Sequence, residues 1–213
     1  MLKAESRQAV EAFFTSVGTQ FNAFLQARRP DDYEEAARLI RESQAGGGRL
    51  HVTGIGKCSH VSTYAASLFS STGNPAYYLH GTEAVHGSCG QLVAGDVVIA
   101  ISNSGETGEL KSTVLAVKNN GCKVIGVSGN PDSWLAKNSD AFLIAGVAEE
   151  GGPLNRAPRA SVLAELLTLQ ALSVALQVER GWDPIQYVRC HPGGKLGQLR
   201  EGEQQEEGAR GIC

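Results

Sequence analysis

One stretch near the middle of the chain, from Asp96 to Gly108, limits most strongly what this sequence can fold into. It reads DVVIAISNSGETG, and its first half is a continuous apolar run of mostly β-branched residues, typical of a parallel strand buried on both faces. Its second half is a turn rich in hydroxyls, and residues 109–120 after it have the pattern of a helix. Such a turn presents free backbone N–H groups and the positive end of a helix dipole, which favours an anion such as phosphate. A helix cap made by Ser104 or Thr107 is the structural alternative.

Segments with strand and helix patterns alternate on both sides of this stretch. We expect strands over residues 49–53, 75–79, 97–101, 123–127 and 141–145, and helices over residues 9–28, 30–45, 59–72, 109–120, 131–137 and 161–179. This alternation implies right-handed crossovers and a parallel sheet with helices on both faces. The predicted fold class is therefore α/β, a three-layer αβα sandwich with a five-stranded parallel sheet.

The first and last predicted helices carry extensive apolar surface. Four of the six phenylalanines lie on the helix over residues 9–28, in a stripe that could cover the sheet or a neighbouring subunit. The helix over residues 161–179 is apolar nearly all round, so we expect it to be buried or shared in a homo-oligomer. We expect residues 1–48 to pack as N-terminal helices on a core domain of residues 49–199, and residues 200–213 to form a disordered tail.

Charge and cysteine content exclude several classes of function. With a formal net charge of -3 and scattered Lys and Arg, the chain has no electrostatic surface for nucleic acid or an anionic membrane, so its expected partner is a small molecule. The five cysteines are widely spaced and include no C-x-x-C pair, which argues against a disulfide framework or a zinc knuckle. We also find no secretion signal and no apolar run long enough to span a membrane, and therefore expect a cytoplasmic location.

A second glycine turn, Gly54 to Lys57, follows the first predicted strand. It is not a dinucleotide fingerprint, because Ser59 stands at the third glycine position. It is not a Walker loop either, because His51 stands where the first glycine belongs and Cys58 follows the lysine. A lysine at a helix start is unfavourable for the helix dipole, which indicates that Lys57 faces an anionic ligand.

Three further loops carry residue types suited to chemistry. His80 and His86 lie in the loop after the second predicted strand. Glu149 and Glu150 follow the fifth strand, and His191 opens a glycine-rich segment near the end of the chain. In open parallel sheets, ligands bind outside the carboxyl ends of the strands, so His80, His86 and the two glutamates are candidates for a binding site. The alternative is that they are solvated loop residues, and the histidines lack the spacing of a three-ligand metal site.

Together these motifs resemble one protein family. SNSGET at 102–107, GIGK at 54–57, the paired histidines, PLN at 153–155 and HPGG at 191–194 occur in an order that resembles the sugar isomerase (SIS) domain. Within that family they resemble the arabinose-5-phosphate isomerases of the lipopolysaccharide and capsule pathway, over roughly residues 5 to 199. The resemblance implies a flavodoxin-like sheet and a homotetramer with sites near subunit interfaces. It also implies interconversion of D-ribulose 5-phosphate and D-arabinose 5-phosphate, the precursor of the sugar Kdo.

The same resemblance implies a set of site residues. The catalytic residues would be Lys57, Glu109, Glu150 and His191. The substrate-binding residues would be Gly73, Asn74, His80, His86, Ser102, Asn103, Ser104 and Thr107. The substrate would be a sugar phosphate, no metal or organic cofactor would be needed, and His80 stands where an inhibitory zinc can bind in the family.

These residue types suit an aldose–ketose isomerisation. Moving a carbonyl between C1 and C2 requires a base that takes a proton from the neighbouring carbon, through an enediol. A carboxylate whose pKa is raised by burial can carry that proton at neutral pH, and we assign this role to Glu150. Lys57 would stabilise the negative charge on the enediolate oxygen. His191 would open the sugar ring, because imidazole titrates near neutrality, and Glu109 would orient the lysine or share the proton transfers.

The sequence departs from the family pattern at three positions near the expected site. Cys58 stands where many relatives have a phosphate-binding serine, Ser59 replaces a glycine, and Ser88 replaces an aspartate. The chain leaves no room for the pair of regulatory CBS modules that relatives commonly carry, so we expect the isomerase domain without them. Two other functions stay open: isomerisation of another phosphosugar, such as 3-hexulose 6-phosphate, and non-catalytic sensing of a sugar phosphate.

Overall fold

A five-stranded parallel sheet forms the centre of the protein, whose structure is a computed structural model that describes residues 1–203. The strands are β1 (Leu50–Gly54), β2 (Ala76–Tyr78), β3 (Val97–Ile101), β4 (Lys123–Ser128) and β5 (Ala141–Ile144). Their order across the sheet is β2-β1-β3-β4-β5, which is the flavodoxin-like order, and every neighbouring pair is parallel. The predicted fold class is confirmed.

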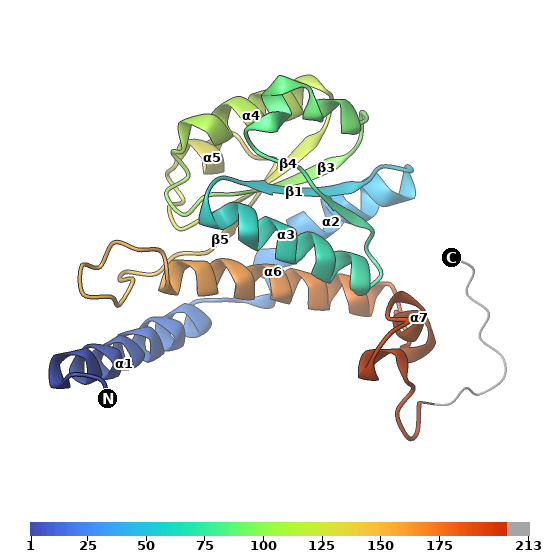
Figure 1. The fold of residues 1–213 in the computed structure, drawn as a ribbon. Coiled ribbons are helices and arrows are strands. Elements are labelled where there is room, and N and C mark those ends of the chain that lie inside the picture. The colour runs from blue at the N-terminus through green and yellow to red at the C-terminus, as the bar shows by residue number, and fades with distance from the viewer. Residues whose placement is uncertain (204–213) are drawn as a thin grey trace.

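Helices cover both faces of the sheet, as Figure 1 shows. On one face lie α2 (Glu34–Ala45), α3 (Lys57–Ser71) and α6 (Ala160–Glu179), and on the other lie α4 (Gly108–Asn119) and the short α5 (Trp134–Lys137). The first helix of the chain is α1 (Ala4–Gln26), and the last α-helix of the described part is α7 (Pro184–Cys190). Short 3-10 turns lie at Pro30–Tyr33, Glu83–His86, Ser88–Gln91 and Lys195–Gly197.

The central strand β3 supplies side chains to two separate cores, because successive residues of a strand point to opposite faces. Val97, Ile99 and Ile101 pack into the cluster under α2, α3 and α6, whereas Val98 and Ala100 pack into the cluster under α4 and α5. All five residues are buried. This explains why the strand needs an unbroken apolar run rather than an alternating one.

The register of the parallel strands brings their carboxyl ends level with one another. Gly54 at the end of β1 pairs with Ile101 at the end of β3, and Ile101 pairs in turn with Val127 of β4. The turns that follow these strands therefore leave the sheet at one edge, here called the carboxyl edge. The opposite edge, where the strands begin, is called the amino edge.

Helix α6 packs one face against the domain, mainly against α3. By length and composition it is apolar enough to cross a membrane, but its buried face includes Leu169, Leu172 and Leu176 in the core. On the other face Val174 and Val178 are exposed. The helix is therefore a core element that still carries apolar surface, as its sequence predicts.

The N-terminal helices differ in how they meet the sheet. Helix α2 buries one side, whereas α1 extends away from the body and has a single buried residue, Phe24 (Figure 1). Phe14 is 67% exposed on α1, so the phenylalanine stripe does not cover the sheet within one chain. Polar contacts tie α1 to the loop after β5, where Gln20 Oε1 accepts a hydrogen bond from the N–H of Ala148 at 2.9 Å.

The structure differs from the predicted elements near the C-terminus and in the loop after β2. Helix α7 was not predicted, although Asp183 and Gln186 form a capping box around Pro184, which is a recognisable helix start. The loop with His80 and His86 contains two 3-10 turns that were not predicted. Of the predicted tail, residues 200–203 form a turn, and residues 204–213 lie outside the described part of the chain.

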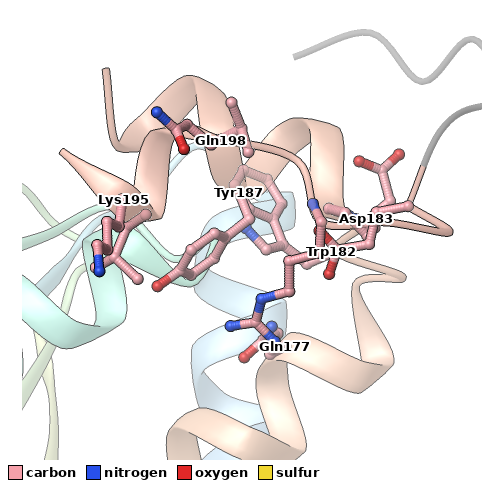
Figure 2. A pocket seen from close by; sticks show the side chains of 11 residues that line it. Gln177, Trp182, Asp183, Tyr187, Lys195 and Gln198 are labelled. Atoms are coloured by element: carbon pink, nitrogen blue, oxygen red, sulfur yellow. The ribbon is translucent and has the colours of Figure 1, made fainter. Parts of the chain in front are cut away.

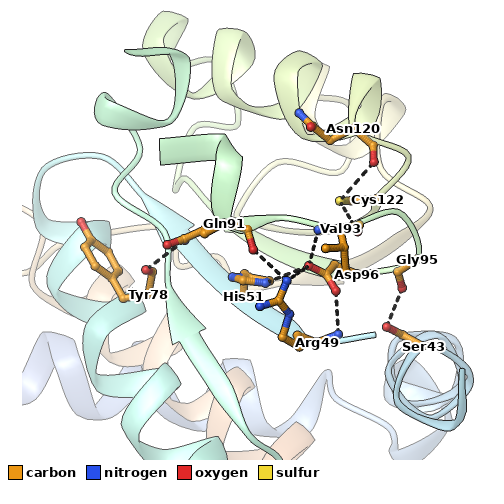
Figure 3. Close-up of polar contacts among 10 residues, drawn as sticks. All are labelled: Ser43, Arg49, His51, Tyr78, Gln91, Val93, Gly95, Asp96, Asn120 and Cys122. Carbon is orange, nitrogen blue, oxygen red and sulfur yellow. Dashed lines mark hydrogen bonds and ion pairs between the residues drawn. The ribbon is translucent and has the colours of Figure 1, made fainter. Parts of the chain in front are cut away.

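A buried carboxylate joins several elements at the amino edge of the sheet (Figure 3). Asp96 is fully buried, and its side chain accepts hydrogen bonds from the backbone N–H of Arg49 at 2.7 Å and of Val93 at 2.9 Å. His51 Nε2 lies 3.1 Å from Asp96 Oδ2. Burial lowers the pKa of His51 despite the opposing attraction of Asp96, so the ring is held as a neutral donor. These bonds fix the starts of β1 and β3 relative to each other.

We expect Asp96→Asn to destabilise the fold without a direct effect on the carboxyl edge. The amide would turn an N–H group toward one of the backbone donors, and losing a buried acceptor of this kind costs about 2–4 kcal/mol. Circular dichroism melting should show a Tm lower by roughly 5–10 °C. Exposed Asp132 offers the control, because Asp132→Asn should leave the Tm nearly unchanged. Equal melting of Asp96→Asn and wild type would contradict the structural role.

Candidate functional site

The hydroxyl-rich turn after β3 is closed by its own side chains. Ser102 Oγ accepts a hydrogen bond from the N–H of Gly105 at 3.1 Å and lies 3.0 Å from Thr107 Oγ1. Ser104 is exposed, and its Oγ accepts from the N–H of Glu106 at 3.2 Å. The turn is thus held in shape by hydrogen bonds within itself.

Residues from β4 and α5 hold the turn from behind. Gly105 has a positive φ of 68°, and a Cβ at this position would collide with the Ser133 side chain, so only glycine fits. The carbonyl of Asn103 accepts hydrogen bonds from Ser128 Oγ at 3.1 Å and from the N–H of Gly129 at 2.9 Å. The turn therefore has a rigid scaffold.

Helix α4 starts directly after this turn and has no side-chain cap. Thr107 occupies the capping position, but its side chain makes no capping hydrogen bond and instead meets Ser102. The first N–H groups of a helix have no acceptor within the helix, so those of α4 are available to a bound anion. The alternative of a helix cap made by Ser104 or Thr107 is therefore wrong, because the Ser104 bond goes to Glu106, which precedes α4. Glu109, in this first turn, is exposed at the carboxyl edge.

Lys57 opens α3 beside the same edge. Gly54 allows the tight approach of this helix to β1, because a Cβ at residue 54 would lie only 2.8 Å from the backbone of Cys58. Gly56 precedes the helix with a positive φ of 63°, and Lys57 is exposed at the first helical position. The glycine turn thus presents a cation where the helix dipole itself would favour an anion.

Glu150 lies at the start of α6, next to the start of α3. Its Oε2 accepts hydrogen bonds from the backbone N–H groups of Arg159 at 2.6 Å and Ser161 at 3.1 Å. Asn155, from the PLN motif, accepts the Glu150 N–H at 2.6 Å and so holds the loop in shape. Glu150 is only half-buried, so the expectation of a buried carboxylate is wrong for this chain by itself. The two backbone bonds use Oε2, which leaves Oε1 free of these contacts.

Helix α1 braces the loop that carries Glu150. Ser16 Oγ donates a hydrogen bond to Glu149 Oε2 at 3.4 Å, and Gly151 packs closely against Phe13 and Ser16.

A mostly apolar groove of about 490 Å³ runs between α3 and α6, starting at the end where α3 and α6 begin. It is lined by Lys57, His60, Val61, Tyr64, Pro158, Val162, Leu166 and Gln170.

Sequence reasoning missed a buried acid behind these residues. Glu165, in the second turn of α6, is completely buried, and its Oε1 accepts a hydrogen bond from the Cys58 thiol at 3.5 Å. Burial raises the pKa of Glu165 to about 7, and the nearby Glu150 adds to the shift. The signal in the sequence is that Glu165 is the one charged residue within the apolar run from Ala160 to Val178.

The histidine loop after β2 contributes two exposed imidazoles to the carboxyl edge. His80 Nδ1 accepts a hydrogen bond from the N–H of Glu83 at 3.3 Å and lies 3.0 Å from Thr82 Oγ1. Because Nδ1 is an acceptor, the neutral ring carries its proton on Nε2 and presents a donor outward. His86 ends the 3-10 turn in the same loop. Among residues 1–203, no group of three His, Cys, Asp or Glu side chains is placed to hold a metal.

Gly73, Asn74 and His191 lie at the other end of the molecule. Gly73 and Asn74 follow the C-terminus of α3, whose 15 residues separate them from Lys57 by about 22 Å. A Cβ on Gly73 would collide with the Trp182 ring, and buried Asn74 accepts a hydrogen bond from Arg180 Nε at 3.1 Å. Both residues therefore shape the junction of α3 with the end of α6.

His191 follows α7, beyond the C-terminal end of α6. Its ring stacks on Tyr187 with centroids 4.1 Å apart, and its Nδ1 lies 2.8 Å from the Tyr187 carbonyl. Tyr187 also lines a cavity of about 240 Å³ with Trp182 and Lys195, which Figure 2 shows between α7 and the segment after it. Because α6 is about 30 Å long, His191 cannot reach Lys57 in the same chain.

The structure thus divides the predicted site residues into two groups. At the carboxyl edge it brings together the turn from Ser102 to Thr107 with Lys57, Glu109, Glu150, His80 and His86. At the far ends of α3 and α6 it places Gly73, Asn74 and His191. The carboxyl edge alone combines hydroxyls, an uncapped helix start, a lysine and a carboxylate, which is the composition of a site for a small phosphorylated molecule.

Comparison with known proteins identifies the family. A model of the SIS domain matches residues 45–175. The chain is 41% identical over 174 residues to arabinose 5-phosphate isomerase KdsD of Pseudomonas aeruginosa, covering 82% of this chain and 52% of that protein. It is 36% identical over 190 residues to KdsD of Francisella tularensis, covering 89% and 58%. The chain spans about half the length of the curated relatives it matches.

A solved structure agrees with this assignment. The Escherichia coli CFT073 protein c3406, in complex with arabinose 5-phosphate, superimposes with a TM-score of 0.82 at 28% identity. The match covers 90% of this chain and all of that one. Since the family model spans more than half of the sequence and the flavodoxin-like sheet agrees with it, the chain belongs to the SIS domain family.

Proposed function

We propose that this chain is an aldose–ketose isomerase that interconverts D-arabinose 5-phosphate and D-ribulose 5-phosphate through an enediol. The main support is the meeting of Lys57, Glu150 and the turn from Ser102 to Thr107 at the carboxyl edge. The choice of substrate is supported by the names of the KdsD relatives and by the arabinose 5-phosphate complex of c3406. The product would supply Kdo for lipopolysaccharide or capsule. We also propose residues 49–199 as the catalytic unit, with residues 1–48 as helices attached to it.

The substrate phosphate binds at the turn from Ser102 to Thr107. The free N–H groups of the first turn of α4 and the exposed Ser104 hydroxyl supply donors, and the helix dipole favours the phosphate dianion. Asn103 belongs to the same turn, and His80 and His86 offer donors to the sugar hydroxyls from the neighbouring loop. This placement leaves the carbonyl end of the sugar facing Lys57 and Glu150.

Glu150 transfers the proton. In the direction from aldose to ketose, Oε1 takes the proton from C2, the C2–H electrons form the C1–C2 double bond, and the aldehyde oxygen gains the negative charge. Glu150 then returns the proton to C1, where the electrons of the C1–C2 double bond form the new C1–H bond, and the hydroxyl proton of O2 passes to O1, so that O1 becomes a hydroxyl and C2 a carbonyl. The Lys57 ammonium stabilises the charged oxygen as it develops, and Glu109 orients the lysine.

His191 acts in ring opening, and it must come from a second copy of the chain. One chain holds Lys57 and His191 at opposite ends of α6, so a site with both residues requires two copies. The same copy would bring Gly73 and Asn74, which lie at that end. A homotetramer with sites near its interfaces satisfies this requirement, and the exposed apolar residues of α1 and α6 are suited to bury such contacts.

We place the reaction in the cytoplasm and assign it no metal or organic cofactor. Cys58, Cys89, Cys122 and Cys190 are free thiols, as expected in a reducing compartment. The proton transfers need only side chains that can exchange protons near neutral pH. Zinc inhibition through His80 would require the Nε2 lone pair, so the ring proton would have to move to Nδ1, which would then lose its bond from the Glu83 N–H but could donate to Thr82 Oγ1.

A substrate panel tests the proposal directly. Purified protein should convert arabinose 5-phosphate and ribulose 5-phosphate into each other without added metal, in an assay that measures the formation of each sugar separately. Turnover of 3-hexulose 6-phosphate with none of arabinose 5-phosphate would assign a different phosphosugar isomerase. Tight binding of a sugar phosphate without turnover of any panel member would indicate a sensor instead of an enzyme.

A further inference from the structure

We propose that Glu165 is a positioning residue that must keep its proton for the substrate phosphate to bind tightly, so that phosphate binding and proton uptake are linked. The proposal rests on the proposed function only in taking the turn from Ser102 to Thr107 as the phosphate site. It concerns a residue that the proton transfers at Glu150 do not use.

Glu165 lies behind the carboxyl edge, and no cation in the described part of the chain acts on its pKa. Its side chain is completely buried, and Oε2 has no hydrogen-bond partner among the described residues. The titratable groups that act on it are the Cys58 thiol on α3 and the Glu150 carboxylate in the loop before α6. Neither is positive, so an ionised Glu165 would add an uncompensated negative charge inside the protein.

Cys58 connects Glu165 to the turn. Its thiol donates to Glu165 Oε1 at 3.5 Å, and the backbone N–H of Asn103, at the start of the turn, is near enough to the sulfur to act on the pKa of the thiol, in the direction opposite to burial. Burial raises the pKa of the Cys58 thiol to about 12, so it stays a neutral donor in this chain of contacts. A negative charge on Glu165 therefore makes the electrostatic potential more negative at the backbone that forms the phosphate site.

The state of Glu165 changes within the working range of pH. Burial raises its pKa to about 7 from the ordinary 4.5, so the carboxyl is neutral below pH 7 and becomes charged above it. A phosphomonoester has its second pKa near 6 and is already a dianion in that upper range. The dianion and the ionised carboxylate repel each other, and by linkage a bound dianion must raise the pKa of Glu165 and take up a proton.

The pH dependence of KM provides the first test. From pH 7 to pH 9, the KM of the wild type for arabinose 5-phosphate should rise by about tenfold. In Glu165→Gln, which has the same shape and no charge to lose, this rise should disappear. The control Asp132→Asn removes an exposed carboxylate from the loop after β4, at the same edge of the sheet, and should keep the wild-type rise. An unchanged rise in Glu165→Gln overturns the proposal.

A second test needs no turnover and no variant. Sulfate has the charge and shape of the phosphate dianion but does not titrate near neutral pH. Its binding to the wild type at pH 8, measured by calorimetry in two buffers of different ionisation enthalpy, should take up a proton. Binding without proton uptake overturns the proposal even if Glu165→Gln fails to fold. If no sugar phosphate is turned over, the isomerase function fails separately, and the sulfate result still decides the role of Glu165.

Discussion

An equal mixture of two inactive variants, Lys57→Ala and His191→Ala, should recover about a quarter of wild-type activity once their subunits have exchanged. Each variant alone should lose at least about a hundredfold in turnover, because one lacks the cation at the enediolate and the other lacks the ring-opening imidazole. In the mixture, half of the chains supply an intact Lys57 and half supply an intact His191. Random pairing therefore completes one site in four.

The expectation follows from α6, a helix about 30 Å long, because within one chain Lys57 lies near its start and His191 lies beyond its end. The measurement is a steady-state assay of the refolded mixture, with each variant alone refolded in the same way. The matched control mixes Lys57→Ala with Glu150→Gln. Both of these residues lie at the same end of α6, so no chain supplies the pair and activity should stay low. No recovery in the first mixture, or equal recovery in both, would contradict a site shared between copies.

The fold could be predicted from the local sequence pattern because a strand that is buried on both faces requires an unbroken run of apolar residues. The apolar run Val97–Ile101 is the strand β3 to the residue, and the five predicted strands all occur. Helix α7 escaped prediction because its seven residues are too few to show a periodic apolar face. Its start at Asp183 and Pro184 was nevertheless visible as a capping signal.

The site could be predicted only as far as the sheet dictates it. Turns that follow parallel strands must share the carboxyl edge, and this is why Lys57, Glu150 and the turn after β3 come together. His191 follows a helix end rather than a strand end, so no rule of sheet topology places it. Glu165 lies within α6, whose apolar sequence predicts a core helix. The spacing of apolar residues gives no reason for a single carboxylate at this position, so its role could not be predicted.

Glu150→Gln should lower turnover by about a hundredfold or more while sugar-phosphate binding is largely retained. The glutamine keeps an amide oxygen that can accept the N–H groups of Arg159 and Ser161 in place of Oε2, so the start of α6 should hold its shape. What it loses is the carboxylate oxygen Oε1, the proposed proton acceptor. Exchange of the C2 hydrogen of arabinose 5-phosphate with deuterated water, followed by NMR, measures this step directly and should fall with turnover.

Two further variants separate the loss of a base from the loss of structure. Glu150→Ala removes the hydrogen bonds to the α6 backbone as well and should lower stability by about 1 kcal/mol, whereas Glu150→Gln should melt like the wild type. The neighbouring Glu149→Gln changes the same charge one residue away and should turn over normally. If Glu150→Gln exchanged the C2 hydrogen at the wild-type rate, the base would have to be another group at the carboxyl edge. A slow exchange in both Glu150 variants, despite their different stabilities, would identify the missing carboxylate as the cause.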